Sequence, residues 1–428
     1  MRFGSGLRIG GDRGLRFEAH TQGGYGRGRW LTILYSGPSV GCMKKRLKMV
    51  SCLLFFAGVS GAWGQLAGTQ RCAVFSPSGM LAKASLTKGS LRVSLYRSDG
   101  GVSNYETPVS EASAYAHECE IAFSPNEKSV AVVGRDQQIE VAAVSTDGAG
   151  TLHHFSVPWN AWKNSPQEQF NNTKLLVGLE DDESVILVRR VYGDGRKDQL
   201  LLERRNLEGE VLSEKALGTP FDRYEHNVSL VQSNAHPLVF FAGWCGANCF
   251  RSFDPVSGLA DRGADLILPT TVASAPTALP AADQLLMVAG EERKEQKALL
   301  VDRTGAVKSE LKLPLQKNPL SVVVPDWFQF RTPAVSSDGA VAVIAERRVA
   351  WVLIDTDRDW GSEFMLLDLA PLKVLSKVRT GKGGIGALAV DRRQGKVRVV
   401  GFWGNAWHDL EWDKEKDKWA DRGPAKSA

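Results

Sequence analysis

Short apolar runs alternate with clusters of turn-forming residues along most of the chain. The runs are rich in Val, Leu, Ala and Phe, and they are broken repeatedly by Gly, Pro, Asp and Asn. No long stretch has the 3.6-residue spacing of an amphipathic helix. The pattern therefore predicts an all-β protein built from short strands.

A turn followed by an apolar strand recurs along the chain at fairly regular intervals. "FSPSGMLAKAS" begins at Phe75, and "FSPNEKSVAVVG", with the same order of turn and strand, begins at Phe123. Related segments begin at Leu179, Ser233, Pro280, Val335 and Val390. These segments predict seven repeats.

A second turn follows each of the first six segments after about 20 residues. Examples are "LYRSDGGV" and "AVSTDGAGT", in which Gly can supply the positive φ of a hairpin turn. Each repeat then divides into four strands. Repeated four-stranded units bury their faces against one another in a β-propeller. We expect seven four-stranded blades; six or eight would also fit, because the third and seventh units are the least regular. A pair of β-sandwiches is the alternative fold.

The "FSPSG" and "FSPNEK" turns and the D-x-x-G hairpins resemble those of bacterial β-propeller proteins of the broad WD-repeat and YVTN-like group. The resemblance covers residues 69–420. It implies the architecture alone, because folds of this kind carry unrelated activities.

Residues 43–64 have the three parts of a secretory signal peptide. A basic cluster precedes an apolar run over 49–59, and small residues follow at Ala62 and Gly64. The apolar run is shorter than the roughly 20 residues of a membrane-spanning helix. We therefore expect cleavage before Gln65, no membrane span after cleavage, and a secreted or periplasmic protein.

Residues 1–42 are rich in Gly and Arg and show neither helical nor strand periodicity. Such a segment cannot bury an apolar core. We expect it to be a non-native upstream extension, with Met43 as the true start, or a disordered segment. Residues 65–428 then form a single β-propeller domain.

The net charge of +5 changes when the segment before Gln65 is set aside. Residues 1–64 contain ten Lys and Arg but only two acidic residues, so 43 basic and 46 acidic residues remain of the 53 and 48 in the full sequence. This nearly balanced charge gives no electrostatic reason for nucleic-acid binding. We expect no nucleic-acid partner.

Four cysteines remain after Gln65, and an even number in an exported chain indicates disulfides. We expect Cys245–Cys249 across the neck of a loop and Cys72–Cys119 near the starts of the innermost strands of neighbouring repeats. The "CGANC" segment lacks the paired two-residue spacers of many zinc sites, and no histidine follows nearby. We expect no metal and no cofactor.

Long connections are predicted at 104–118, 158–172, 218–227, 315–331 and 346–363, on the face opposite the "FSPSG" turns. They contain aromatic residues that would suit a sugar or an apolar partner side chain, although the rings could instead pack the loops onto the blades. These candidates are Trp159, Trp162, Tyr224, His226, Trp327 and Trp360. Arginines at the ends of predicted second strands, Arg135 and Arg347 among them, could bind a carboxylate or phosphate. The alternative is that they form exposed ion pairs with neighbours such as Glu346.

These features predict an exported binding module that engages a partner protein or glycan through its aromatic-rich long-loop face. One alternative is a glycan hydrolase or lyase on the same scaffold. Another is a structural module of the cell envelope that pairs through blade edges. No nucleophile elbow, phosphate-binding loop or dinucleotide fingerprint is present, so we expect binding rather than catalysis. Ligand identity and oligomeric state stay open.

Overall fold

The computed structural model divides the chain into two units, 1–64 and Gln65–Ala428. All of the residues that the structure describes belong to the second unit. They are 70–87, 89–109, 119–135, 138–148, 150–157, 175–180, 184–191, 199–216, 227–232, 237–244, 248–253, 266–267, 274, 276–279, 284–290, 295–302, 306–315, 326–352, 356–381 and 384–423.

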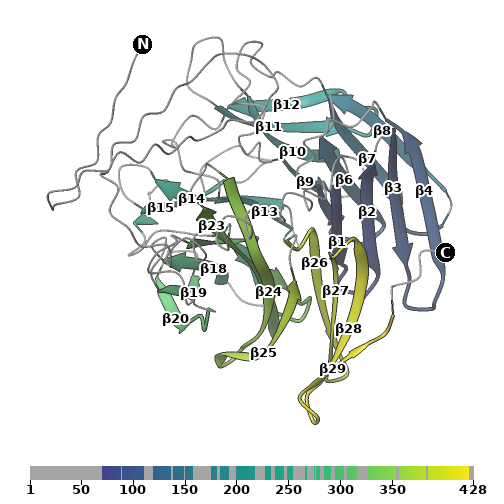
Figure 1. Cartoon of the computed structure of the whole chain (residues 1–428). Coiled ribbons are helices and arrows are strands. Elements are labelled where there is room, and N and C mark those ends of the chain that lie inside the picture. Colours follow the sequence, from purple (N-terminus) through teal and green to yellow (C-terminus); the bar gives the residue numbers. More distant parts are fainter. Residues whose placement is uncertain are drawn as a thin grey trace, which may run out of the picture. The chain divides into compact units, whose positions relative to one another are not determined.

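Strands and turns make up the described part of the chain, and no helix occurs in it. Every sheet is built from consecutive antiparallel strands (Figure 1). Sheet 1 contains β1 (Gln70–Phe75), β2 (Leu81–Thr87), β3 (Ser90–Tyr96) and β4 (Val102–Pro108). Sheet 2 contains β5 (Glu120–Phe123), β6 (Ser129–Arg135), β7 (Ile139–Ser145) and β8 (Leu152–Val157). Sheet 3 contains β9 (Leu175–Glu180), β10 (Ser184–Val191), β11 (Gln199–Asn206) and β12 (Val211–Ala216).

The remaining sheets follow the same order, with one addition. Sheet 4 contains β13 (Asn227–Gln232), β14 (Pro237–Trp244), β15 (Asn248–Phe253) and β16 (Leu266–Ile267). Sheet 5 contains β17 (Thr277–Ala278), β18 (Gln284–Gly290), β19 (Gln296–Asp302) and β20 (Val307–Lys312). Sheet 6 has five strands: β21 (Asp326–Phe330), β22 (Ala334–Val335), β23 (Val341–Val352), β24 (Thr356–Leu369) and β25 (Leu372–Gly381). Sheet 7 contains β26 (Ala387–Arg393), β27 (Lys396–Trp403), β28 (Ala406–Asp413) and β29 (Lys418–Asp421).

A buried serine organises the turn between the first and second strands of three sheets. Ser76, Ser124 and Ser336 are almost fully buried, and each hydroxyl oxygen accepts a hydrogen bond from the backbone N–H at or just before the following strand. The donors are Met80, Ser129 and Val341, at 3.0 to 3.1 Å. The serine therefore replaces a ladder partner where the chain reverses, which explains the recurring "FSP" and "SSDG" segments.

Alternating side chains form the core between neighbouring sheets. In β3, Leu91, Val93 and Leu95 are buried in a cluster with sheet 2, whereas Arg92 between them is exposed. Corresponding apolar clusters join sheets 2 and 3, sheets 5 and 6, and sheets 6 and 7. Within the described residues, sheets 1, 2, 6 and 7 thus bury both faces against their neighbours, as propeller blades do.

The first and last sheets also pack against each other. Phe75 and Leu81 of sheet 1 form a cluster with Ala389 and Val400 of sheet 7, and β1 lies beside β26 (Figure 1). The innermost strands contact one another in the cycle β1, β5, β9, β13, β17, β22, β26 and back to β1. We call the contact between sheets 1 and 7 the seam.

The seventh sheet has its own outer strand. In the structure β29 pairs with β28 from Leu410 to Asp413, so a segment near the C-terminus completes the sheet.

Candidate functional site at the base of the β23–β24 ribbon

Two strands of sheet 6 are longer than all the other described strands. β23 has 12 residues and β24 has 14. β22 pairs with the first half of β23, and β21 pairs with the second half, from Glu346 to Ala350. β25 pairs with β24 only from Ser362 onward. Residues 326–330, 346–352 and 356–361 therefore form a three-stranded extension, which we call the ribbon.

The ribbon corrects part of the predicted long-loop face. Segments 315–331 and 346–363 were expected to be loops, but Trp327 lies in β21, Trp360 lies in β24 and Arg347 lies within β23. The sequence contained a signal for these strands, because "WFQF" and "VAWV" consist mainly of aromatic and β-branched residues, which favour strands. The ribbon brings these three predicted residues into one structural element. Their role in binding stays a prediction.

A β-bulge marks the position of Trp360. Arg348 pairs with Gly361 and Val349 pairs with Asp359, so Trp360 is the extra residue between two consecutive pairs. Gly361 has a φ of 129°, a conformation that favours glycine. Bulges bend a strand and are common next to functional sites.

The remaining predicted site residues lie wholly or partly outside the described part of the chain. Trp159, Trp162, Tyr224 and His226 lie outside the described residues. Arg135 is the last residue of β6, at the predicted end of a second strand, and its side chain is outside the described part.

Two buried carboxyl groups face each other at the base of the ribbon. Glu346 in β23 is the cross-strand partner of Glu363 in β24, and each residue is 5% exposed. The sequence had suggested Glu346 as a surface partner of nearby arginines, but the structure places it inside. It shares its strand face with Ala342 and Ile344, which pack against sheet 5.

A lysine binds one member of this pair. Lys377 of β25 places its ammonium nitrogen 3.3 Å from Oε1 of Glu363 and also donates to the carbonyl oxygen of Pro314. Oε2 of Glu346 has no hydrogen-bond partner among the described residues. Burial, together with the negative charge of Glu363 and a hydrogen bond to it, raises the pKa of Glu346 to about 8, although Lys377 and Arg348 oppose the rise.

The opposite face of the ribbon base meets sheet 7. Arg347 is exposed, and its aliphatic stem lies against Gly384, where an added Cβ would be 3.5 Å from Cδ of the arginine. Arg331 donates a 2.5 Å hydrogen bond to the carbonyl oxygen of Ile385. Two consecutive residues just before β26 therefore contact Arg347 of β23 and Arg331, which follows β21.

An aromatic cluster between sheets 6 and 7 was not predicted from the sequence. The ring centroid of Phe364 lies 5.8 Å from that of Trp403 and 5.6 Å from that of Trp419. The Trp403 ring stacks on His408 at 4.2 Å. Trp403 is buried, so these rings stabilise the packing of sheets 6 and 7.

Arg189 lies near the end of β10, the second strand of sheet 3, and is a buried structural group. Arg189 of β10 bonds Oε1 of Glu203 through two nitrogens, at 3.1 and 2.7 Å, while Arg205 bonds Oε2 at 3.0 Å. Burial opposes ionisation of Glu203, but the hydrogen bonds and charges of both arginines hold its pKa below the ordinary value. Arg189 therefore stabilises the protein interior through its ion pair with Glu203.

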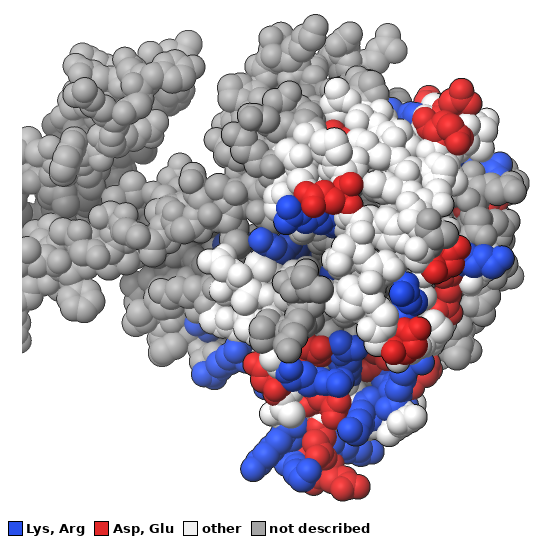
Figure 2. Space-filling view, turned by 90° about the vertical axis from the view of Figure 1, so that its right-hand side faces the viewer, with Lys and Arg blue, Asp and Glu red and all other residues white. Residues whose placement is uncertain are grey.

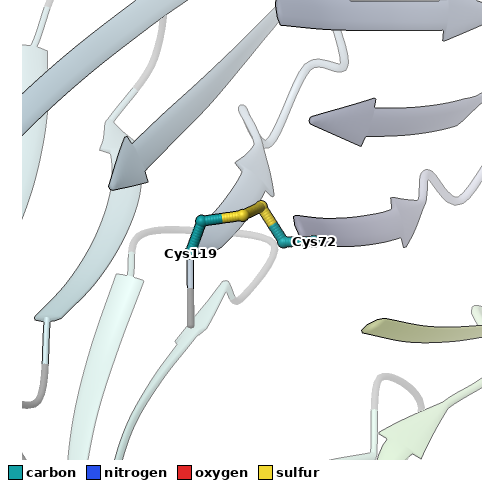
Figure 3. The surroundings of a disulfide bond; sticks show 2 residues. All are labelled: Cys72 and Cys119. Carbon is teal, nitrogen blue, oxygen red and sulfur yellow. A yellow bond between two sulfur atoms is a disulfide. The ribbon is translucent and has the colours of Figure 1, made fainter. Parts of the chain in front are cut away.

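One of the two predicted disulfides is present. Cys72 in β1 is bonded to Cys119, just before β5, with 5.5 Å between their Cα atoms (Figure 3). The bond joins the innermost strands of sheets 1 and 2. Cys245 lies outside the described residues, and so does the side chain of Cys249, so their pairing stays a prediction.

Surface charges on one side of the molecule are mixed in sign. Figure 2 shows basic and acidic side chains interleaved at the lower end of this view, toward the β28–β29 hairpin. Glu411 pairs with both Lys396 and Arg422, and Asp413 pairs with Lys416. Exposed pairs of this kind contribute little stability, but they leave no single-signed patch on this hairpin.

The described residues contain no group of three His, Cys, Asp or Glu side chains arranged to hold a metal ion. His154, for example, bonds Glu140 at 2.9 Å, and Ser156 donates to the same carboxyl oxygen. Within the described ranges there is also no helix long and apolar enough to cross a membrane.

Comparison with known proteins bears on the fold. No family model matches the chain, and no curated protein matches it. The periplasmic gluconolactonase PpgL of Pseudomonas aeruginosa is similar in structure, with a TM-score of 0.50 and 12% identity over 83% of this chain and 95% of that chain.

Two further solved propellers are similar over most of their length. The Dos1 propeller has a TM-score of 0.46 and 13% identity over 85% of this chain and 86% of that chain. The Swd1 propeller domain of Myceliophteria thermophila has a TM-score of 0.47 and 9% identity over 78% of this chain and 94% of that chain. Sequence identities this low are evidence of a similar fold and say nothing about function. The cyclic contacts of the four-stranded sheets and the likeness to the gluconolactonase identify the fold as a β-propeller.

Proposed function

We propose that this chain is an exported binding protein that engages a partner protein or a glycan through the ribbon and the surface around it. The observation that carries the proposal is the ribbon itself. It extends two strands of one sheet beyond the four-stranded unit and includes Trp327, Arg347 and the bulged Trp360. Elements that depart from a repeat without contributing to its core are where repeat proteins place function.

The base of the ribbon supports this role. Arg331 and Arg347 contact sheet 7 on one side, and Lys377 links β24 to the Pro314 carbonyl on the other. A binding element held at both sides loses little conformational freedom when a ligand docks. Among the ribbon side chains that the structure describes, those of Gln329 and Arg347 are exposed and could be reached by a ligand.

A photo-crosslinking experiment tests the location of the binding surface. A photoreactive residue replaces Gln329 in the ribbon in one variant and Gln394 in the β26–β27 turn in the other. Both glutamines are exposed, and Gln394 lies at the end of the sheets where the "FSPSG"-type turns occur. A glycan array and an envelope extract supply the ligands. We expect crosslinks from position 329 and none from position 394; the reverse result would contradict the proposed surface.

Substitutions test the same surface energetically. Replacing Trp327, Arg347 or Trp360 with Ala should weaken binding by about 2 kcal/mol or more if the residue is a hot spot. A residue that only packs the ribbon would instead lower the free energy of unfolding. Turnover of a bound glycan would replace the binding proposal with the hydrolase or lyase alternative.

A further inference from the structure

We propose that Glu346 and Glu363 form a binding site for one proton that holds the base of the ribbon closed, so that loss of the proton loosens the ribbon. The site is the buried carboxyl pair between β23 and β24. Its effect on ligand binding rests on the proposed function, whereas its effect on the fold does not.

The geometry of the pair requires a proton or a second cation. Both carboxyl groups are almost fully buried and occupy directly opposed positions of neighbouring strands. Like charges placed in this way repel strongly when they are removed from water. The amino group of Lys377 contacts Glu363, while Oε2 of Glu346 has no hydrogen-bond partner in the described part of the chain.

The charged groups around the pair come from three strands. β23 contributes Arg348, which lowers the pKa of Glu346, and β25 contributes Lys377, which also lowers it. Arg379 of β25 pairs in register with Glu363 but is exposed. Sheet 5 packs against the same face of β23 through apolar side chains such as Val288 and Leu300. The carbonyl group of Pro314 is bonded to Lys377. The cost of burying a second negative charge beside that of Glu363 therefore exceeds the stabilisation that the nearby cations give to ionised Glu346.

The position of the pair connects the proton to the ribbon. Glu346 is paired with Phe330 of β21 on one side and with Glu363 of β24 on the other, so it is the first residue of β23 that belongs to the ribbon. A shared proton joins two of the three strands by a hydrogen bond. Two unprotonated carboxylates would push the same strands apart.

The sign of the pH effect follows from the raised pKa of Glu346. The folded value is about 8, and an unfolded glutamate has a pKa of about 4.3. Between these values the folded protein binds one more proton than the unfolded chain. The contribution to stability is therefore complete below about pH 4, falls as pH rises, and is lost above about pH 8.

The pH dependence of unfolding tests the site in the full chain without any ligand. The Glu346→Gln variant keeps the volume and a hydrogen-bond donor but cannot lose a proton. Between pH 5 and 8, the slope of unfolding free energy against pH should differ between the wild type and this variant by about one proton. Equal slopes would overturn the proposal.

Two further variants should shift, in opposite directions, the pH range over which the protein loses stability as Glu346 ionises. Lys377→Met removes a cation that favours the charged form of Glu346, so the loss of stability should extend to higher pH. Glu363→Gln removes the repelling carboxylate, so the loss should end at lower pH. Shifts of the same sign, or no shifts, would contradict a proton shared by the pair.

Hydrogen exchange tests the connection to the ribbon. After correction for intrinsic rates, amides of 349–352 and 356–359 should exchange faster above pH 8 than at pH 7 in the wild type but not in Glu346→Gln. Amides of β2 and β3 provide the control and should not change. Stabilisation by added Ca²⁺ at pH 8.5 that disappears in Glu346→Gln would identify a metal ion as the occupant and overturn the proton. If the proton linkage is found but no ligand binds the ribbon, only the proposed function fails.

Discussion

Arg71 of β1 lies over the ring of Phe402 in β27, with its guanidinium carbon 3.8 Å from the ring centroid. The contact crosses the seam between the first and last sheets. Arg398 lies over Phe75 and Lys83 lies near the Trp407 ring, so two more cation–π contacts cross the same seam. Among the described residues, side-chain contacts join the first and last sheets, each of which consists of consecutive strands of its own.

The coupling between Arg71 and Phe402 can be measured with a double-mutant cycle. Arg71→Met and Phe402→Leu remove the interaction but keep apolar bulk. We expect a coupling energy of about 0.5 to 2 kcal/mol in denaturant unfolding, because cation–π contacts contribute more when they are desolvated. Arg92→Met, which breaks an exposed pair with Glu106, is the control and should change stability little. Strict additivity of the two seam substitutions would show that the contact contributes nothing.

Lys83 should make stability rise with pH in the alkaline range. Its side chain is buried at the seam, and burial lowers its pKa to about 8; Asp409 opposes this change and Arg398 reinforces it. Because an unfolded lysine has a pKa of about 10.4, the unfolded chain binds more protons between these values. Stability should therefore increase from about pH 8 to 10.4 in the wild type. This increase should be absent in Lys83→Met, as measured by urea unfolding at a series of pH values; an unchanged profile would refute the assignment.

The Cys72–Cys119 disulfide should contribute substantially to stability. It closes a loop with a sequence separation of 47, for which the chain-entropy model gives about 4 kcal/mol. Replacing both cysteines with Ala should lower the free energy of unfolding by an amount of this order. Peptide mapping under non-reducing conditions provides the direct check, since free thiols at these two positions would contradict the bond.

Glu203 should be more sensitive to substitution than any exposed acid of sheet 7. Its carboxylate is fully buried between Arg189 and Arg205. Glu203→Ala leaves two buried guanidinium groups without this partner and should cost about 3 to 5 kcal/mol. Glu411→Ala is the control, because its ion pairs are more exposed. A triple replacement of Arg189, Glu203 and Arg205 by apolar residues should be less harmful than the single change.

The strand order could be predicted from the sequence because the turns have their own chemistry. The segments at Phe75, Phe123 and Val335 each contain a serine whose hydroxyl accepts a hydrogen bond inside the turn, so the recurrence of the segment marks the same turn in three sheets. Cys72 and Cys119 were paired correctly for a related reason. Their positions relative to these turns place both cysteines at the innermost strands of adjacent sheets.

The ribbon and its carboxyl pair could not be obtained in the same way. The segment 346–363 is predicted to be a loop, and it contains residues typical of loops, such as Asp357 and Asp359. Pairing with β21 and β23 overrides this local preference. Glu346 and Glu363 are opposed only because of the strand register, and no local pattern shows that either carboxyl group is buried.

The seam also determines when the propeller can become complete during synthesis. The ribosome makes Phe75 and Leu81 long before Ala389 and Val400, the residues that cover them. Until the last sheet emerges, the face of sheet 1 that later packs against sheet 7 must stay in contact with solvent or with a chaperone. A nascent chain that stalls before Ala387 would carry this apolar face uncovered, even though its earlier sheets had already been synthesised.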